Sequence, residues 1–478
     1  MSPKSLLPFA VGAIVLSAGC SSSSALAVAP GHVTAASAER SNSKVTSKIS
    51  HVIVIIQENR SFENFFAGYP GANAPMTGCA SPPPSGSIKP LTSGSGGCPY
   101  GDTQVTLHQV TFKNNPDLKH DWSSSMIDCN ITASSVCNMD GFSAWGMSHG
   151  QYSAYAYVER SQVQPYWTMA QQYVLADEMF PTEFGGSFTA HLTLVAGTDD
   201  IKLPGRAEVD FPSAAPDDCD SPPGTKSSYV SQKPYRHIHP WQGGFPCFDQ
   251  FNTMAQVLDN SGISWRIYAS KLLDAGFWEP FEAIKYTRYG PDWYNDVSAP
   301  QTNVLTDAQN GNLASVSWVT PSGVDSDHPT YKSDLGPSWV TSVVNAIGQS
   351  QYWSSSAIIV LWDDWGGFYD NAPPPQLDYR GLGIRVGCLI ISPYAKTNYV
   401  SHVQYEFGSI LRFIEEVNGL PAGSIGSVAQ GYTDARATSL DDAFNFNQAP
   451  RPFKAIPSKY PLSHFLHEPP SNAPVDTE

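Results

Sequence analysis

The chain has 478 residues, of which 41% are hydrophobic and 15% are charged. This composition is typical of a globular protein and excludes an intrinsically disordered chain. The formal net charge of −16 argues against binding to a nucleic-acid backbone, which requires a basic surface.

The N-terminus has the pattern of an export signal. Lys4 precedes the apolar run 6–16, which is too short to span a bilayer and has the length of a signal-peptide core. Small residues directly before Cys20 resemble the lipobox of bacterial lipoproteins, which implies cleavage before Cys20 and a lipid on its sulfur. The alternative is ordinary signal cleavage farther along, with loss of Cys20. We therefore expect an exported protein, lipid-anchored to the cell envelope on the periplasmic or cell-surface side, or else secreted.

The chain divides into four expected parts. Residues 1–20 form the lipoprotein signal peptide, and the Ser/Ala-rich residues 21–48 form a flexible tether. Residues 49–445 form one folded domain, because no repeat and no second-domain boundary interrupts them. Residues 446–478 are a Pro-rich C-terminal tail.

Seven cysteines follow Cys20. Six of them lie in Pro/Gly/Ser-rich sequence and fall into local couples, whereas Cys388 lies in an apolar run and is expected to be a buried thiol. In an oxidising compartment the couples predict three disulfides. These are Cys79–Cys98, Cys129–Cys137 and Cys219–Cys247.

Strand and helix patterns alternate along the domain. This alternation predicts an α/β fold, in which a mainly parallel central sheet is covered on both faces in a three-layer α/β/α sandwich. Two long Pro/Gly/Ser-rich segments, 70–101 and about 202–247, are expected to form loops that wall a site. The expected strands are 51–56, 173–176, 263–269, 314–319, 357–362 and 385–391, and the expected helices are 187–195, 251–258, 338–347 and 404–417.

Polar residues follow two of the expected strands. Asp363 and Asp364 come directly after strand 357–362, and Glu58 and Asn59 come directly after strand 51–56. In open α/β sheets ligands bind beyond the carboxyl ends of strands, and adjacent acids repel unless a cation or a shared proton relieves them. The pattern favours a metal site over the alternative of a solvated turn.

A serine and three histidines are further candidates. Ser187 follows two glycines at the start of an expected helix, where the helix N-terminus stabilises an alkoxide or a phosphate; a plain helix cap is the alternative. His120 and His328 each follow a short polar stretch of sequence. His191 stands one helical turn beyond Ser187, where it either faces the site or packs beneath the loop, and we rank it below the other two.

Three motifs occur in the same order as in a known family. They are Glu58-Asn59-Arg60-Ser61-Phe62, Ser326-Asp327-His328-Pro329 and Trp362-Asp363-Asp364-Trp365-Gly366-Gly367-Phe368-Tyr369-Asp370. From about residue 50 to about residue 420 the chain resembles the bacterial phosphoesterase family. That family comprises the phosphatidylcholine-type phospholipases C and the related acid phosphatase, within the alkaline-phosphatase-like superfamily. The resemblance implies an alkaline-phosphatase-like fold.

The resemblance also implies a metal site and a reaction. One divalent cation is expected, with Ser187 as both nucleophile and ligand and with His120 and His328 around the transferred phosphoryl group. A set of oxygen ligands suits Ca²⁺, Mg²⁺ or Mn²⁺. The expected reaction is hydrolysis through a phospho-Ser187 intermediate, with His120 or His328 protonating the leaving group. The implied metal ligands are Glu58, Asn59, Ser187, Asp363 and Asp364.

The chain departs from the family pattern at three positions. Asn371 stands where relatives often have a histidine after the Asp-Asp motif, and Tyr286 and Thr287 stand where another histidine is common. These departures put the rate and the substrate preference in question.

Three functions remain open from the sequence. The end of the chain soon after the last motif favours an acid-phosphatase-like enzyme acting on a small phosphate ester. A phospholipase C acting on phospholipid is the first alternative, and a non-catalytic ligand-binding lipoprotein is the second.

Overall fold

A computed structural model describes residues 48–81, 98, 102–131, 136–201 and 206–471. The expected signal peptide, the lipid anchor at Cys20 and nearly all of the tether lie outside these residues. Among the described helices, none combines the length and the hydrophobicity needed to cross a bilayer.

The centre of the molecule is a nine-stranded sheet with the strand order β13-β12-β14-β1-β15-β16-β8-β17, in which β18 also pairs with β8. Every pairing is parallel except those of β16, which is antiparallel to both β15 and β8. The strands are β1 (His51–Gln57), β8 (Val174–Phe180), β12 (Trp265–Tyr268), β13 (Val297–Ser298), β14 (Val316–Val319), β15 (Ser356–Trp362), β16 (Val386–Ile391), β17 (Tyr399–Ser401) and β18 (Tyr405–Glu406).

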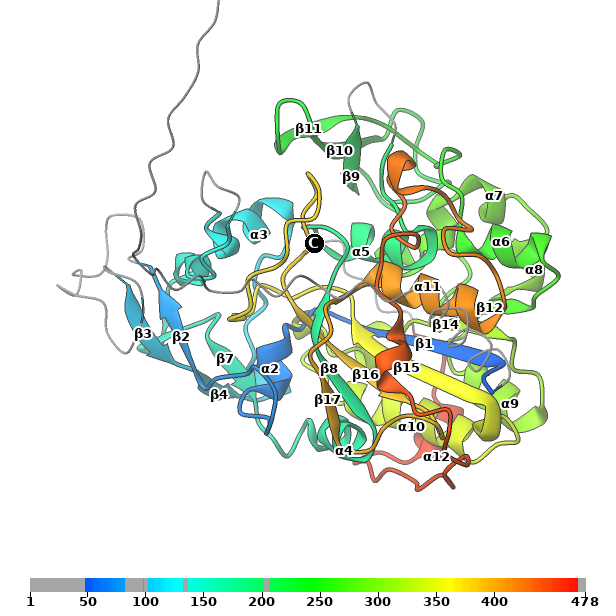
Figure 1. Cartoon of the computed structure of the whole chain (residues 1–478). Helices are drawn as coiled ribbons and strands as arrows, with labels where there is room; N and C mark the ends of the chain where they lie inside the picture. The colour runs from blue at the N-terminus through cyan, green and yellow to red at the C-terminus, as the bar shows by residue number, and fades with distance from the viewer. Residues whose placement is uncertain (1–47, 82–97, 99–101, 132–135, 202–205, 472–478) are drawn as a thin grey trace, which may run out of the picture.

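Helices cover both faces of this sheet (Figure 1). One face carries α5 (Ser187–Ala196) and α11 (Phe407–Val417), with α6 (Met254–Asn260) beside α5. The other carries α4 (Gln164–Gln172) and α10 (Gly336–Gly348), which α9 (Asn303–Asn310) and α12 (Leu462–Leu466) contact. Every residue of β15 is buried, as expected for a strand covered on both sides. The three-layer α/β/α expectation is confirmed.

The six expected strands and four expected helices all exist, with shifted ends. Strand β8 continues to Phe180 because the polar pair Asp177-Glu178 interrupts its apolar run without ending the strand. Helix α6 begins at Met254 because Thr253 caps it and forms a capping box with Gln256 of its first turn. The antiparallel direction of β16 was not expected; segment 363–385 contains no helix that could serve as a crossover, so the chain returns in the opposite direction.

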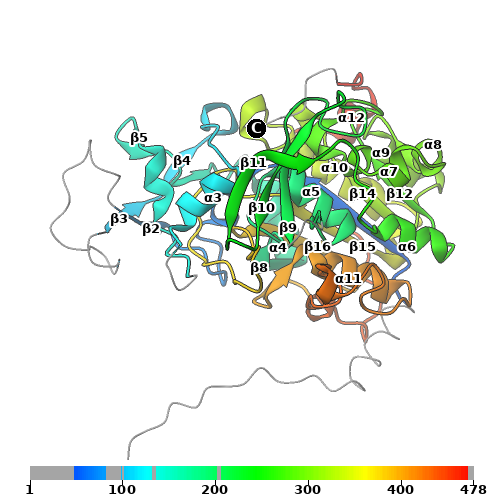
Figure 2. The same cartoon turned by 90° about the horizontal axis from the view of Figure 1, so that it is seen from above.

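The segment 202–247 is more ordered than expected. Its described part forms a three-stranded antiparallel sheet, order β11-β10-β9, which lies above α5 when the molecule is seen from above (Figure 2). Prolines and glycines around these strands obscured their pattern in the sequence. The strands are β9 (Ala207–Pro212), β10 (Lys226–Ser231) and β11 (His237–Gly244).

Smaller elements complete the described chain. They are β2 (Thr77–Ala80), β3 (Thr103–Thr106), β4 (His108–Val110), β5 (Met147–Ser148), β6 (Gln151–Tyr152), β7 (Ala156–Val158), α2 (Phe62–Phe66), α3 (Trp122–Cys129), α7 (Lys285–Arg288) and α8 (Asp292–Asn295).

All three expected disulfides are confirmed. Cys79–Cys98, Cys129–Cys137 and Cys219–Cys247 are bonded, and Cys388 is a buried free thiol. Burial raises the pKa of the Cys388 thiol, which makes it a weak nucleophile.

Removing the Cys219–Cys247 bridge is expected to lower the free energy of unfolding by about 2–4 kcal/mol, because the bridge restricts the unfolded chain. A double replacement by serine, followed by urea denaturation, measures the change. As a control, thiol titration of the denatured wild type without reductant should find the Cys388 thiol and at most that of Cys20. Six or seven reactive thiols would contradict the disulfide assignment.

Candidate active site

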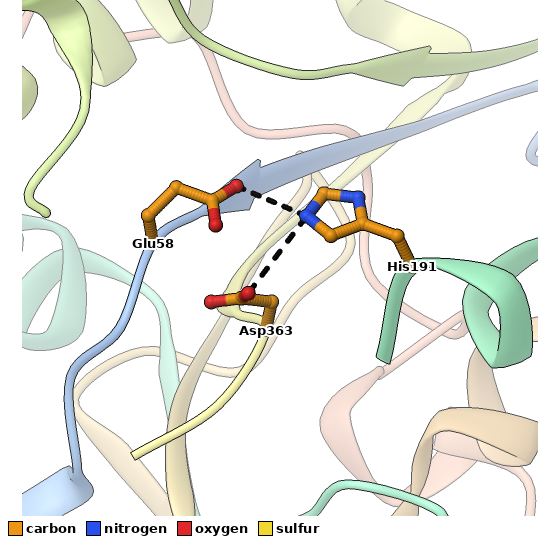
Figure 3. A group of neighbouring side chains, drawn as sticks. All are labelled: Glu58, His191 and Asp363. Carbon is orange, nitrogen blue, oxygen red and sulfur yellow. Dashed lines mark hydrogen bonds and ion pairs between the residues drawn. The ribbon is translucent and has the colours of Figure 1, made fainter. Parts of the chain in front are cut away.

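Two carboxylates and an imidazole meet at the carboxyl edge of the sheet (Figure 3). Strands β1 and β15 are in parallel register, with Gln57 beside Trp362, so Glu58 and Asp363 leave the sheet side by side. His191, on α5, points its Nε2 between them, at 3.0 Å from Glu58 Oε1 and 3.8 Å from Asp363 Oδ2. All three side chains are fully buried.

The remaining expected ligands lie directly beside this group. Asn59 Nδ2 is 3.3 Å from Ser187 Oγ and 3.2 Å from Asp364 Oδ2, and Ser187 Oγ is itself 3.3 Å from Asp364 Oδ2. The backbone N–H of Asn59 donates to Asp363 Oδ1 at 2.9 Å. The structure thus brings all five expected ligand residues together, although their roles as ligands stay predictions.

Close backbone packing holds the loops in this arrangement. Asn59 has φ of 56° and Gly366 has φ of 61°, in the left-handed region that glycine and asparagine tolerate best. A Cβ on Gly366 would lie 2.1 Å from the carbonyl oxygen of Asn59. The N–H of Gly366 also donates to Asp364 Oδ1 at 2.7 Å, so this turn orients the second carboxylate.

The charge balance of the site calls for a cation. Three buried carboxylates, Glu58, Asp363 and Asp364, converge here. Burial lowers the pKa of His191 to about 4, although Asp363 acts in the opposite direction, so the imidazole is neutral at pH 7 and brings no positive charge. Among the described residues, Asn59 Oδ1 and Asp363 Oδ2 accept no hydrogen bond. Buried charges are costly unless paired or bound to a metal, and this donor set fits a divalent cation.

His120 and His328 form a pair, with ring centroids 5.6 Å apart. His120 Nδ1 lies 2.6 Å from the Leu118 carbonyl and must donate to it, which leaves Nε2 as the acceptor of the neutral ring. His328 Nδ1 accepts from the N–H of Thr330, which assigns the proton of the neutral ring to Nε2. At Nε2, the neutral His120 ring therefore accepts a hydrogen bond, whereas the neutral His328 ring donates one.

The histidine pair is fixed to the metal-site loops through neighbouring residues. His120 packs 6.5 Å from the ring of Trp365, which directly follows Asp364. Arg60 is fully buried and donates from Nε to the carbonyl of Asp327 at 2.8 Å, so it holds the residue before His328. Glu58, Asn59 and Arg60 are all fully buried, which excludes the alternative of a solvated turn at this motif.

His191 was ranked too low from the sequence, since it contacts two of the expected metal ligands. Its position four residues after Ser187, on the same helix face, was the available signal. The three departures lie in other surroundings. Asn371 bonds to Asn73 and Arg385, the Tyr286 hydroxyl bonds to Asp259 at the surface, and Thr287 is buried on α7.

The chain is similar to known proteins over most of its length. The model of the phosphoesterase family matches residues 49–421. Phospholipase C B of Mycobacterium tuberculosis is 23% identical, over 89% of this chain and 80% of its own length. The non-hemolytic phospholipase C of Pseudomonas aeruginosa is 24% identical, over 86% of this chain and 59% of its own length.

Similarity to solved structures is weaker. A protein of the alkaline phosphatase superfamily from Vibrio parahaemolyticus superposes with a TM-score of 0.31 and 14% identity, over 55% of this chain and 62% of its own. This value is too low to carry an argument about the site.

Proposed function

The chain belongs to the phosphoesterase family and is a phosphoric ester hydrolase, and we propose on this premise that it uses Ser187 as nucleophile and depends on one divalent cation. The observation that carries the proposal is the placement of the Ser187 hydroxyl. It lies at the N-terminus of α5, 3.3 Å from Asp364 Oδ2, beside the group Glu58, His191 and Asp363. A hydroxyl in such a position is activated by a metal and by the helix N-terminus.

In the proposed first step Ser187 Oγ attacks phosphorus and the bond to the ester oxygen breaks. His120 Nε2 takes the proton of the Ser187 hydroxyl and passes it to that leaving oxygen, to which the Nε2–H of His328 donates a hydrogen bond, in keeping with the tautomer that Thr330 imposes. In the second step water attacks the phospho-Ser187 intermediate, His120 Nε2 takes a proton from the water, and this proton passes to Ser187 Oγ as its bond to phosphorus breaks. Such proton transfers contribute on the order of 10²–10⁴ in rate, and positioning contributes most of the rest.

Glu58, Asn59, Asp363 and Asp364 would hold the cation, which when bound screens the charge on the phosphoryl oxygens. His191 adds a nitrogen donor within 4.8 Å of two of the carboxylates. Ca²⁺ and Mg²⁺ take oxygen ligands, whereas Mn²⁺, which also prefers oxygen, is the one transition metal of the three and accepts an imidazole more readily. We therefore favour Mn²⁺ among the three cations that the sequence left open.

Chelation followed by reconstitution tests the metal. Apoprotein is expected to be inactive on p-nitrophenyl phosphate, and Mn²⁺ is expected to restore more turnover than Ca²⁺. His191→Gln should lower the ratio of turnover with Mn²⁺ to turnover with Ca²⁺, because the nitrogen donor is lost. A protein that contains no metal as purified and, even after addition of Mn²⁺ or Ca²⁺, hydrolyses none of p-nitrophenyl phosphate, its choline diester and phosphatidylcholine liposomes would instead favour a non-catalytic ligand-binding lipoprotein.

Export belongs to the same proposal. Three disulfides in the described chain favour an oxidising compartment, which agrees with the signal sequence and with a lipid anchor at Cys20. The enzyme's proposed substrates are small phosphate esters, with phospholipids as the alternative.

A further inference from the structure

A cavity lies beside the two chain segments that carry His120 and His328, and it has no assigned role. Its volume is about 610 Å³, within the range of small-molecule sites. Strand β4, the hairpin of β5 and β6, and Lys332 contribute to its walls. Figure 2 places β4 and β5 together on one side of the molecule, next to α3.

The walls of this cavity, the polyol pocket, are polar. Ten of its twelve lining residues have polar side chains, and no carboxylate is among the described lining residues, although the net charge of the chain is −16. Amides and hydroxyls can both donate and accept, which suits a ligand rich in hydroxyl groups. The residues that carry the argument are His108, Gln109, Asn115, His149, Gln151 and Lys332.

Asn115 and Lys332 lie together on the wall of the pocket. The Asn115 side chain is 1% exposed. Lys332 is held over Asn115 by a hydrogen bond from Nζ to the Asn115 carbonyl, and an ammonium retains two further donors for an anion.

Two short chain segments link the walls of the pocket to the histidine pair. Asn115 precedes His120 by five residues, and Lys332 follows His328 by four. The Thr330 hydroxyl donates to Asp117 Oδ2 at 2.6 Å and ties the two segments together. Each segment therefore carries a pocket residue at one end and a histidine of the pair at the other.

We propose that the polyol pocket is the subsite for the leaving group of the substrate, and that it takes a polyhydroxylated group with its own negative charge, as in a sugar bisphosphate. This inference rests on the proposed phosphoester hydrolysis. A choline head group fits poorly, because a quaternary ammonium is recognised by aromatic faces or by carboxylates. The only aromatic rings among the described lining residues are imidazoles, and no carboxylate is among them.

The test compares kcat/KM for fructose 1,6-bisphosphate, glucose 6-phosphate and p-nitrophenylphosphorylcholine on the metal-loaded protein. The bisphosphate is expected to be the best substrate. Lys332→Met should lower the ratio of kcat/KM for fructose 1,6-bisphosphate to kcat/KM for glucose 6-phosphate at least tenfold. Lys113→Met, an exposed lysine outside the lining, should leave this ratio unchanged.

Calorimetry separates failure of the pocket from failure of the proposed function. Binding of fructose 1,6-bisphosphate that is lost in Lys332→Met but kept in Lys113→Met, without turnover of any ester, would support the pocket and reject the hydrolytic mechanism. Turnover with no preference for the bisphosphate, and no change of the ratio in Lys332→Met, would overturn the pocket alone.

Discussion

Replacing Ser187 with alanine is expected to lower kcat on p-nitrophenyl phosphate at least about 1000-fold, since the proposed nucleophile is removed. Metal affinity should fall far less, because three carboxylates and His191 remain in place. Steady-state kinetics measure the first quantity and calorimetry with Mn²⁺ the second. Acid quenching of wild type during turnover should trap phosphate on the peptide that contains Ser187.

Thr253→Ala is the matched control for Ser187→Ala. Thr253 stands directly before helix α6 and caps it, because its hydroxyl accepts from the N–H of Gln256; its cap hydrogen bonds are with Gln256 and not with a residue of the proposed site. It should cost about 1 kcal/mol of stability and leave kcat unchanged. A Ser187→Ala protein that keeps a tenth or more of the wild-type kcat would mean that water attacks phosphorus directly.

Replacing Asp363 with asparagine is expected to have opposite effects on the apoprotein and on the metal-loaded protein. Without metal, Asp363 is fully buried beside Glu58, and its Oδ2 accepts no hydrogen bond from the residues that the structure describes, so neutralising it removes repulsion and should raise Tm by a few degrees. With metal, a charged ligand is lost. Mn²⁺ affinity should fall about 100-fold or more, and kcat/KM about 1000-fold. Thermal unfolding with and without Mn²⁺ measures both effects.

Asp370→Asn is the control that distinguishes the loss of a metal ligand from the loss of a buried acid with a structural role. Asp370 is equally buried and lies on the same loop, but it pairs with Arg385 at 3.0 Å. Its replacement leaves a buried guanidinium without this partner and should destabilise the protein by about 3–5 kcal/mol, with or without Mn²⁺. An Asp363→Asn protein that behaves in the same way would refute the metal site.

Much of the site was predictable because its residues directly follow apolar strands. Glu58-Asn59 and Asp363-Asp364 end β1 and β15, whose continuous apolar runs are clear in the sequence. What the sequence did not contain was the register that sets Gln57 beside Trp362 and so joins the two pairs. Register depends on packing across the whole sheet, which no local pattern encodes.

The unexpected features also have physical reasons. His191 was underrated because a histidine inside an apolar helix is compatible with simple core packing, and only the approach of Glu58 and Asp363 distinguishes the two cases. The sheet in segment 202–247 was missed because its short strands contain Pro, Gly and Ser, which usually indicate loops. The direction of β16 depends on a connection without regular structure, and its local sequence does not encode a direction.

The backbone contact at Gly366 restricts which substitutions the loop after Asp364 tolerates, whereas the hairpin of β5 and β6 is not restricted in this way. A library that randomises the loop after Asp364 would lose most of its members at Gly366, where any Cβ meets the Asn59 carbonyl. The walls around His149 and Gln151 belong to a separate hairpin and can vary without moving the metal ligands. Directed evolution toward new substrates should therefore accumulate its changes on that hairpin and conserve the loop.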